Sequence, residues 1–140
     1  QIERKNMSTR LTLIAQHLSE TSSTTLLDEF HPTTGLRHFC LNSPKSLNAI
    51  TVEMAKGLMT EVPKFHVDPS QKAILLTGTG DRAFCAGADL IEDSPPRDLK
   101  LKPFYVYTAM QFLSQLEKPV IALCHGATVG SGWGLVSSAK

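Results

Sequence analysis

A stretch rich in glycine and alanine limits what this chain can fold into more than any other feature. Residues 78–90 read Gly-Thr-Gly-Asp-Arg-Ala-Phe-Cys-Ala-Gly-Ala-Asp-Leu and come soon after an apolar run at 73–76. Because so few side chains intervene, the backbone here can approach another molecule closely. The sequence therefore predicts a buried strand followed by a turn, here called the first glycine turn (residues 78–90), whose peptide N–H groups form a binding surface.

A second stretch has the same composition. An apolar run at 119–124 leads into His-Gly and then Gly-Ser-Gly, here called the second glycine turn (residues 125–132). Backbone N–H groups presented by such turns can stabilise a negatively charged oxygen. We therefore expect the two turns to face a single ligand oxygen.

Length and charge narrow the classes of protein. The chain has 140 residues, which suits one domain with a hydrophobic core. The formal net charge is +1 and no basic block occurs, so no extended nucleic-acid surface is expected. No window reaches the roughly 18 apolar residues that a membrane span requires, so we expect no membrane partner.

The cysteines and histidines predict neither disulfides nor a metal site. Cys40, Cys85 and Cys124 are an odd number, separated by 45 and 39 positions, which fits neither a zinc motif nor a set of paired disulfides. We expect three small buried side chains in a reducing compartment. The five histidines include no pair at helical ligand spacing, so metal binding is not expected.

The first half of the chain predicts a hairpin and a helix. Strand patterns at 24–30 and 36–41 flank a turn at 31–35. A helix is expected at about 51–65, with Asn48 or Thr51 as its N-cap. Its expected buried face comprises Val52, Ala55, Leu58, Met59 and Val62.

The second half continues the alternation. A short strand at 72–77 has little polar alternation, which predicts cover on both faces. A helix at about 99–117 and a last strand at 119–124 follow, so the element order is α/β with an incomplete sheet. Residues 1–23 are expected to be an N-terminal extension, either a targeting remnant or a partner-binding segment.

Four short motifs occur in order along the chain. They are Pro-Lys-Ser-Leu-Asn-Ala at 44–49, Leu-Thr-Gly at 76–78, Arg-Ala-Phe-Cys-Ala-Gly-Ala-Asp-Leu at 82–90, and the run from Lys118 to Gly132. Together they resemble the crotonase (enoyl-CoA hydratase/isomerase) family. The resemblance implies the N-terminal portion of that family's ββα spiral and an acyl-CoA-binding domain.

The resemblance covers residues 24–140. Within the family, residues 125–135 are most similar to the 3-hydroxyisobutyryl-CoA hydrolases. Those hydrolases resemble this chain in having glycine at the position of Gly134, where hydratases typically carry glutamate.

The resemblance also implies the site residues. Two backbone N–H groups, matched to Ala88 and Ser131, would hold the thioester carbonyl oxygen as an oxyanion hole. Loss of one such donor typically costs ~3 kcal/mol of transition-state stabilisation. The positions that usually line the coenzyme A pocket match Lys45, Leu47, Ala86, Asp89 and Leu90. No cofactor is expected beyond the coenzyme A that the substrate carries.

Hydrolysis of a thioester also needs a base or a nucleophile, and here the chain departs from the family. No Asp or Glu lies between Lys118 and Lys140. Val106 occupies the position where the hydrolases usually carry an acid. Ser131 replaces a glycine that is common in the family, which keeps the N–H but narrows the space for an acyl group.

Other polar residues near the turns are expected to be structural. Asp89 is interpreted as a turn or cap residue, because Asp often accepts hydrogen bonds from nearby backbone N–H groups. Glu92 and Asp93 are interpreted as solvated loop charges. We expect His125 to satisfy local hydrogen bonds and Trp133 to lie in the core.

Three functions are consistent with these residues. The first is an acyl-CoA hydrolase of mitochondrial valine breakdown, acting on 3-hydroxyisobutyryl-CoA, whose acids come from a further polypeptide that completes the fold. The second is a crotonase-fold subunit without catalysis in a large RNA–protein assembly, since the family resemblance extends to a component of the mitochondrial ribosome small subunit. The third is a regulatory acyl-CoA binder. Whether the chain is an enzyme is left open at this point.

Overall fold

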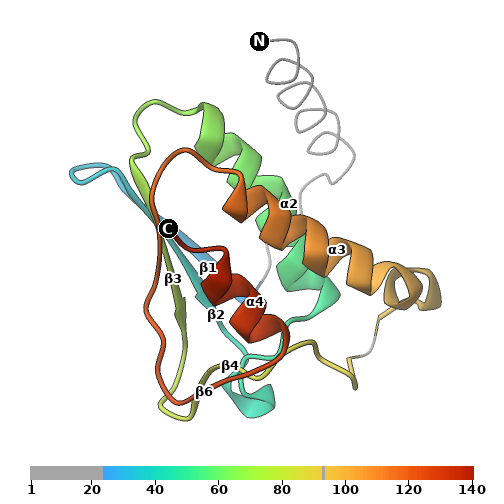
Figure 1. The fold of residues 1–140 in the computed structure, drawn as a ribbon. Helices are drawn as coiled ribbons and strands as arrows, with labels where there is room; N and C mark the ends of the chain where they lie inside the picture. Colours follow the sequence, from blue (N-terminus) through green and yellow to red (C-terminus); the bar gives the residue numbers. More distant parts are fainter. Residues whose placement is uncertain (1–23, 93) are drawn as a thin grey trace.

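The computed structural model describes residues 24–92 and 94–140 (Figure 1). Strands β1 (Leu26–His31) and β2 (Leu36–Leu41) form the predicted antiparallel hairpin. Strand β3 (Ala73–Gly78) pairs with β2 in parallel, and β5 (Val120–Ala122) pairs with β3 in parallel. The strand order of this sheet is therefore β1-β2-β3-β5.

Two long helices lie side by side on one face of the sheet (Figure 1). They are α2 (Val52–Val67) and α3 (Pro96–Ser114). All five residues predicted on the buried face of α2 are buried. All of them except Val52 pack in one core with strand residues such as Phe39, Ile74 and Leu76. Burial of this apolar surface is the main force that holds the helices on the sheet.

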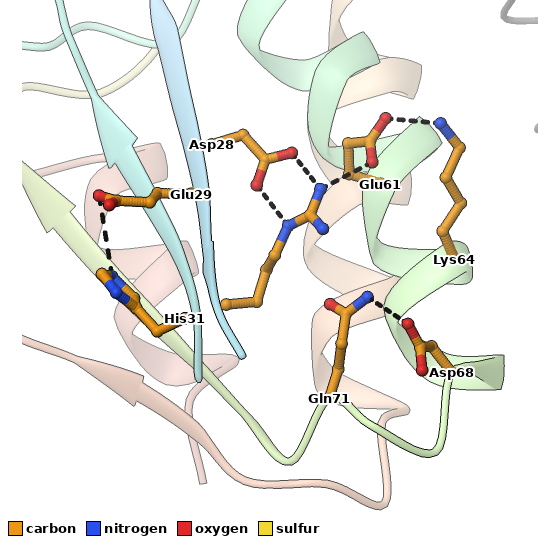
Figure 2. Close-up of polar contacts among 8 residues, drawn as sticks. Asp28, Glu29, His31, Glu61, Lys64, Asp68 and Gln71 are labelled. Carbon is orange, nitrogen blue, oxygen red and sulfur yellow. Dashed lines mark hydrogen bonds and ion pairs between the residues drawn. The ribbon is translucent and has the colours of Figure 1, made fainter. Parts of the chain in front are cut away.

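The boundaries of α2 follow from its sequence. Thr51 is the N-cap, and its hydroxyl oxygen accepts a hydrogen bond from the N–H of Met54 at 3.1 Å. Of the two N-cap candidates, the structure therefore selects Thr51. The helix ends before Asp68, whose carboxylate accepts a hydrogen bond from the N–H of Ser70. It also accepts one from the side-chain amide of Gln71 (Figure 2).

The expectation that β3 is covered on both faces is wrong. Ile74 and Leu76 point to the helices and are buried, whereas Leu75 and Thr77 on the other face are only half-buried. Ile121 on the neighbouring strand is 51% exposed. Among the described residues, helices α2 and α3 cover one face of the sheet, and the other face is here called the uncovered face.

Polar side chains join the hairpin to α2 at the helix-covered face. Arg37 on β2 forms an ion pair with Asp28 on β1 and a second one with Glu61 on α2, at 3.0 Å (Figure 2). Glu29 and His31 lie on the opposite side of β1 (Figure 2). Successive side chains of a strand point to opposite faces of the sheet. Asp28 therefore faces α2, whereas Glu29 and His31 lie on the face that α2 does not cover (Figure 2).

Two short elements were not predicted as strands. Strands β4 (Ala83–Cys85) and β6 (Ala127–Thr128) arise within the glycine turns and form a second, two-stranded sheet. A short helix, α4 (Ser131–Ser137), follows β6, and the 3-10 turn η1 (Pro44–Ser46) precedes α2. The predicted extension at 1–23 lies outside the described residues, so its boundary with residue 24 stays a prediction.

Candidate functional site

The two glycine turns meet, although residues 91–124 separate them in the sequence. β4 and β6 pair in parallel, with Ala83 opposite Ala127 and Cys85 opposite Thr128. The carbonyl oxygen of Cys85 accepts a hydrogen bond from the N–H of Val129 at 3.1 Å. This small sheet places the loop that follows β4 beside the start of α4.

Gly87 lies where the first glycine turn packs against Val129 and Ser131 of the second. A Cβ atom built on this residue would lie 3.3 Å from the carbonyl oxygen of Val129 and 3.7 Å from the backbone nitrogen of Ser131. Its φ of +102° is also a value that side chains disfavour. The positive φ favours glycine here, and a side chain would also crowd the carbonyl oxygen of Val129.

The N–H of Ala88 points away from Ile50, the residue with which Ala88 forms an isolated bridge. Ile50 donates to the carbonyl oxygen of Gly87 at 2.7 Å and accepts from the N–H of Asp89 at 2.9 Å, which forms an isolated parallel bridge with Ala88. In such a bridge the residue between the two bonded groups directs its own N–H to the opposite side. The backbone N–H of Ala88 is therefore directed to the side away from Ile50.

The N–H of Ser131 is also available. Ser131 is the first residue of α4, and the first N–H groups of a helix have no partner within it. Within residues 24–92 and 94–140, neither Ala88 nor Ser131 donates a backbone hydrogen bond. Two adjacent turns thus each contribute one unbonded donor, and their role with a ligand stays a prediction.

The loop before α2 packs against the first glycine turn. This loop, here called the Lys45 loop (residues 42–48), contains Leu47, whose carbonyl oxygen accepts a hydrogen bond from the N–H of Ala86 at 3.0 Å. Lys45 itself is exposed. A small open pocket lies between the loop and the turn, lined by Pro44, Leu47, Asn48, Thr79, Gly80, Asp81, Arg82 and Ala83.

The buried amide of Asn48 was missed as a site residue, because the sequence suggested only a capping role. Its Nδ2 donates to the carbonyl oxygens of Thr79 and Ala83, and its Oδ1 accepts from the N–H of Ser43 at 2.9 Å. The residue is fully buried. Asn48 therefore fixes the Lys45 loop to the first glycine turn.

The expected turn role of Asp89 is confirmed. Its Oδ1 accepts a hydrogen bond from the N–H of Ile91 at 2.9 Å. The neighbouring Leu90 is 93% exposed, as is Ile91. These two apolar side chains extend from the loop without contact to the core.

The expectation that Glu92 is a solvated charge is wrong. Its carboxylate accepts hydrogen bonds from the N–H of Val52 at the start of α2 and from the hydroxyl of Ser94, and it forms an ion pair with Lys102 of α3. Burial raises the pKa of Glu92, but hydrogen bonds from Lys102, Ser94 and Val52 outweigh this and leave the pKa below its ordinary value. Asp93 lies outside the described residues.

Lys102 connects this cluster to the first glycine turn. Besides Glu92, its ammonium group donates to the carbonyl oxygen of Asp89. The residue is 8% exposed although it is charged. A charged lysine that is buried this far needs hydrogen-bond partners. Its hydrogen bond to the carbonyl oxygen of Asp89 also fixes the residue that follows Ala88.

The structure also places Trp133, the three cysteines, Val106 and His125. Trp133 is 63% exposed rather than in the core, and Cys124 is exposed while Cys40 and Cys85 are buried. Val106, which the family resemblance matches to an acidic position, is buried in the core with Ala109. His125 accepts a bond from Phe84 through its backbone, whereas its Nε2 is buried without a hydrogen-bond partner among the described residues.

Comparison with protein families decides the classification. A family model described as enoyl-CoA hydratase/isomerase matches residues 36–140. The chain belongs to this family. The predicted α/β fold of the crotonase family is thereby confirmed. A solved enoyl-CoA hydratase from Bacillus anthracis superposes with a TM-score of 0.74 at 25% identity, over 84% of this chain and 46% of that one.

Curated relatives of two kinds match this family member. The mitochondrial 3-hydroxyisobutyryl-CoA hydrolases of Homo sapiens and Bos taurus are 36% and 32% identical, over 68% and 96% of this chain and 26% and 36% of their own lengths. The small ribosomal subunit protein mS47 of Schizosaccharomyces pombe is 33% identical over 84% of this chain and 28% of its own length. The chain thus spans about a third of the length of these relatives. No helix of the described residues has the length and hydropathy needed to cross a bilayer.

Proposed function

We propose that this chain forms the acyl-CoA-binding part of a mitochondrial thioester hydrolase that resembles the 3-hydroxyisobutyryl-CoA hydrolases. One observation carries the proposal. The N–H groups of Ala88 and Ser131 belong to two turns that meet at Gly87, and neither donates a hydrogen bond within the described residues. Two such donors are what a carbonyl oxygen needs when it becomes an oxyanion.

In the proposed reaction, the thioester carbonyl oxygen accepts hydrogen bonds from Ala88 and Ser131. Water adds to the carbonyl carbon, and the negative charge that develops on the oxygen is stabilised by the two N–H groups. The C–S bond then breaks, which releases the carboxylic acid and the thiol of coenzyme A. A base must take the proton of the water. Because Val106 is apolar, we assign this base to a further polypeptide that completes the site.

The coenzyme A part of the substrate is proposed to lie along the Lys45 loop and the first glycine turn. Leu47 and Ala86 are joined through their backbones, so the two segments form one wall. Lys45 is exposed beside this wall and can meet a phosphate group. Asp89 and the exposed Leu90 complete the set of residues that the family resemblance assigns to the pocket.

The test removes the N–H donor of residue 131 and compares this change with one that alters only the side chain. Proline lacks an N–H but is well tolerated at the first position of a helix, which is where Ser131 lies. Assayed together with the polypeptide that supplies the base, the variant Ser131→Pro should lower kcat for 3-hydroxyisobutyryl-CoA about 100-fold or more. The matched variant Ser131→Ala keeps the N–H and should retain most of the activity. Equal rates in the two variants would refute the oxyanion role of Ser131.

A second function is supported by a different observation. The mS47 relative aligns with 84% of this chain, and Val106 replaces the acid expected of a hydrolase. In this alternative, the fold serves as a structural subunit of a mitochondrial ribosome and the turns have no catalytic use. Co-sedimentation of the tagged protein with the mitochondrial small subunit, unchanged in Ser131→Pro and without thioesterase activity, would favour it over the hydrolase.

A further inference from the structure

Three polar side chains gather on the uncovered face of the sheet, away from the glycine turns. Glu29 and His31 are two positions apart on β1, so both project from the same face. His38 of β2 is the cross-strand partner of Glu29. Figure 2 shows Glu29 and His31 on the side of β1 opposite to Asp28, which faces α2. The hairpin register therefore brings together Glu29, His31 and His38, whose positions in the sequence do not match the spacing of ligands on one helix.

We infer that Glu29, His31 and His38 form a binding site for a divalent transition-metal ion such as zinc. Each residue offers one ligand atom, and the three atoms lie within 4.8 Å of one another. The inference departs from the expectation of no metal site, which considered only the spacing of ligands along a helix. Glu29 and His31 are two positions apart, so they lie on one face of a strand. Together with the hairpin register, this spacing could have indicated the site from the sequence.

The distances fit a metal site after small side-chain rotations. Ligand atoms around a tetrahedral zinc ion lie about 3.3 Å apart, because each lies about 2.0–2.1 Å from the metal. Nε2 of His31 and a carboxylate oxygen of Glu29 are already 3.7 Å apart. Their side chains are 41% and 65% exposed, so both can rotate toward an ion at low cost.

The ligand chemistry also suits this class of ion. Imidazole suits zinc and related metals, and zinc also binds carboxylate oxygens. Three protein ligands leave a coordination position for water. His38 has a further partner, because its Nε2 lies 2.7 Å from the hydroxyl of Thr77. A hydrogen bond from the second ring nitrogen is what usually orients a metal-binding histidine.

An ion pair alone does not account for the cluster. A pair between exposed Glu29 and His31 contributes little to stability. It also gives no role to His38, whose ring shares the site. A bound metal uses all three side chains and would link β1 to β2 across the hairpin.

The experiment is an isothermal titration of the whole chain with zinc chloride in a buffer that does not chelate metals. We expect one equivalent of zinc to bind. Either His31→Ala or His38→Ala should weaken the affinity about 10-fold or more, and Glu29→Gln should also weaken it. His66→Ala on α2 serves as the matched control and should leave the affinity unchanged. Circular dichroism of each variant verifies that the hairpin variants remain folded.

The exposed thiol of Cys124 provides a competing ligand on the same molecule. Zinc binding that persists in the His31→Ala/His38→Ala double variant, or that is lost in Cys124→Ser, overturns the inference. So does the absence of saturable binding at zinc concentrations up to roughly 1 mM, which corresponds to about 4 kcal/mol of binding free energy. None of these outcomes depends on the proposed thioesterase activity.

Discussion

Asn48 donates a hydrogen bond from Nδ2 to the carbonyl oxygen of Ala83 at 2.8 Å, across 35 positions of the chain. The same amide group donates to Thr79, and its oxygen accepts from the N–H of Ser43. One buried side chain therefore satisfies backbone groups of both the Lys45 loop and the first glycine turn. This relationship fixes the Lys45 loop against the first glycine turn, and these two segments form the proposed wall of the coenzyme A pocket.

Replacement of Asn48 by alanine should lower the free energy of unfolding by about 3 kcal/mol. Two buried carbonyl oxygens would lose their donor, and each unsatisfied group costs roughly 1–3 kcal/mol. The φ of Asn48 is +55°, which asparagine tolerates better than alanine. Urea unfolding measures the loss. Asn42→Ala, which removes a more exposed amide bonded to Thr24, is the control and should cost under about 1 kcal/mol.

The pair of Lys102 and Glu92 should make stability depend on pH. The pKa of Glu92 in the folded chain lies below its ordinary value of 4.5, so its contribution to stability is present above pH 4.5 and is lost as the pH falls through the folded pKa. The difference in unfolding free energy between the parent and Glu92→Gln should therefore be largest near pH 7. It should shrink in acid, which urea unfolding at several pH values can verify.

A companion variant tests the other half of the pair. Lys102→Met should cost about 3 kcal/mol at neutral pH, because it leaves the carboxylate of Glu92 buried without its cation. It also frees the carbonyl oxygen of Asp89, next to Ala88. If each variant lost the same unfolding free energy at neutral and at acid pH, the ionic role assigned to Lys102 and Glu92 would be contradicted.

The sequence predicts the local elements well because their causes are local. The hairpin follows from alternating strands around a turn, and α2 follows from an apolar stripe with Thr51 before it. The helix predicted at 99–117 is found at Pro96–Ser114, because proline is well suited to the first turn of a helix. The family motifs extend this success to the α/β fold, since the model of that family matches residues 36–140.

The features that sequence reasoning missed all depend on distant partners. Glu92 is buried only because α3 brings Lys102 to it, and Trp133 is exposed because α4 turns its other face to the core. Strands β4 and β6 are each too short to leave a pattern, and they exist because the two glycine turns pair. Residue type alone could not reveal these contacts, which are made across the fold.

The three cysteines should differ in reactivity, contrary to the expectation of three buried thiols. Cys85 is buried, and desolvation raises its pKa to about 11, so its thiol stays protonated at neutral pH. Cys40 is buried as well, whereas Cys124 is exposed. Titration of the native protein with a thiol-specific disulfide reagent should therefore modify one thiol rapidly. Cys124→Ser should abolish this fast phase, and a fast phase that survives would place the reactive thiol elsewhere.

Two glycines of α4 should respond in opposite ways to alanine. A Cβ on Gly132 would lie 2.4 Å from the backbone oxygen of Cys85, which the β4–β6 sheet holds in place. Gly132→Ala should therefore lower the unfolding free energy by about 1–3 kcal/mol and separate α4 from β4.

At Gly134 the nearest atoms belong to the side chain of Met110, with its sulfur 2.7 Å from the added Cβ. Methionine is flexible and can move aside. Alanine also favours the helix over glycine by up to ~1 kcal/mol, so Gly134→Ala should be neutral or stabilising. Thermal unfolding of the two variants side by side measures the contrast. A destabilisation of similar size at both positions would show that Met110 is as fixed as the backbone of β4, and that α4 has no tolerance for a side chain on the face it turns to α3.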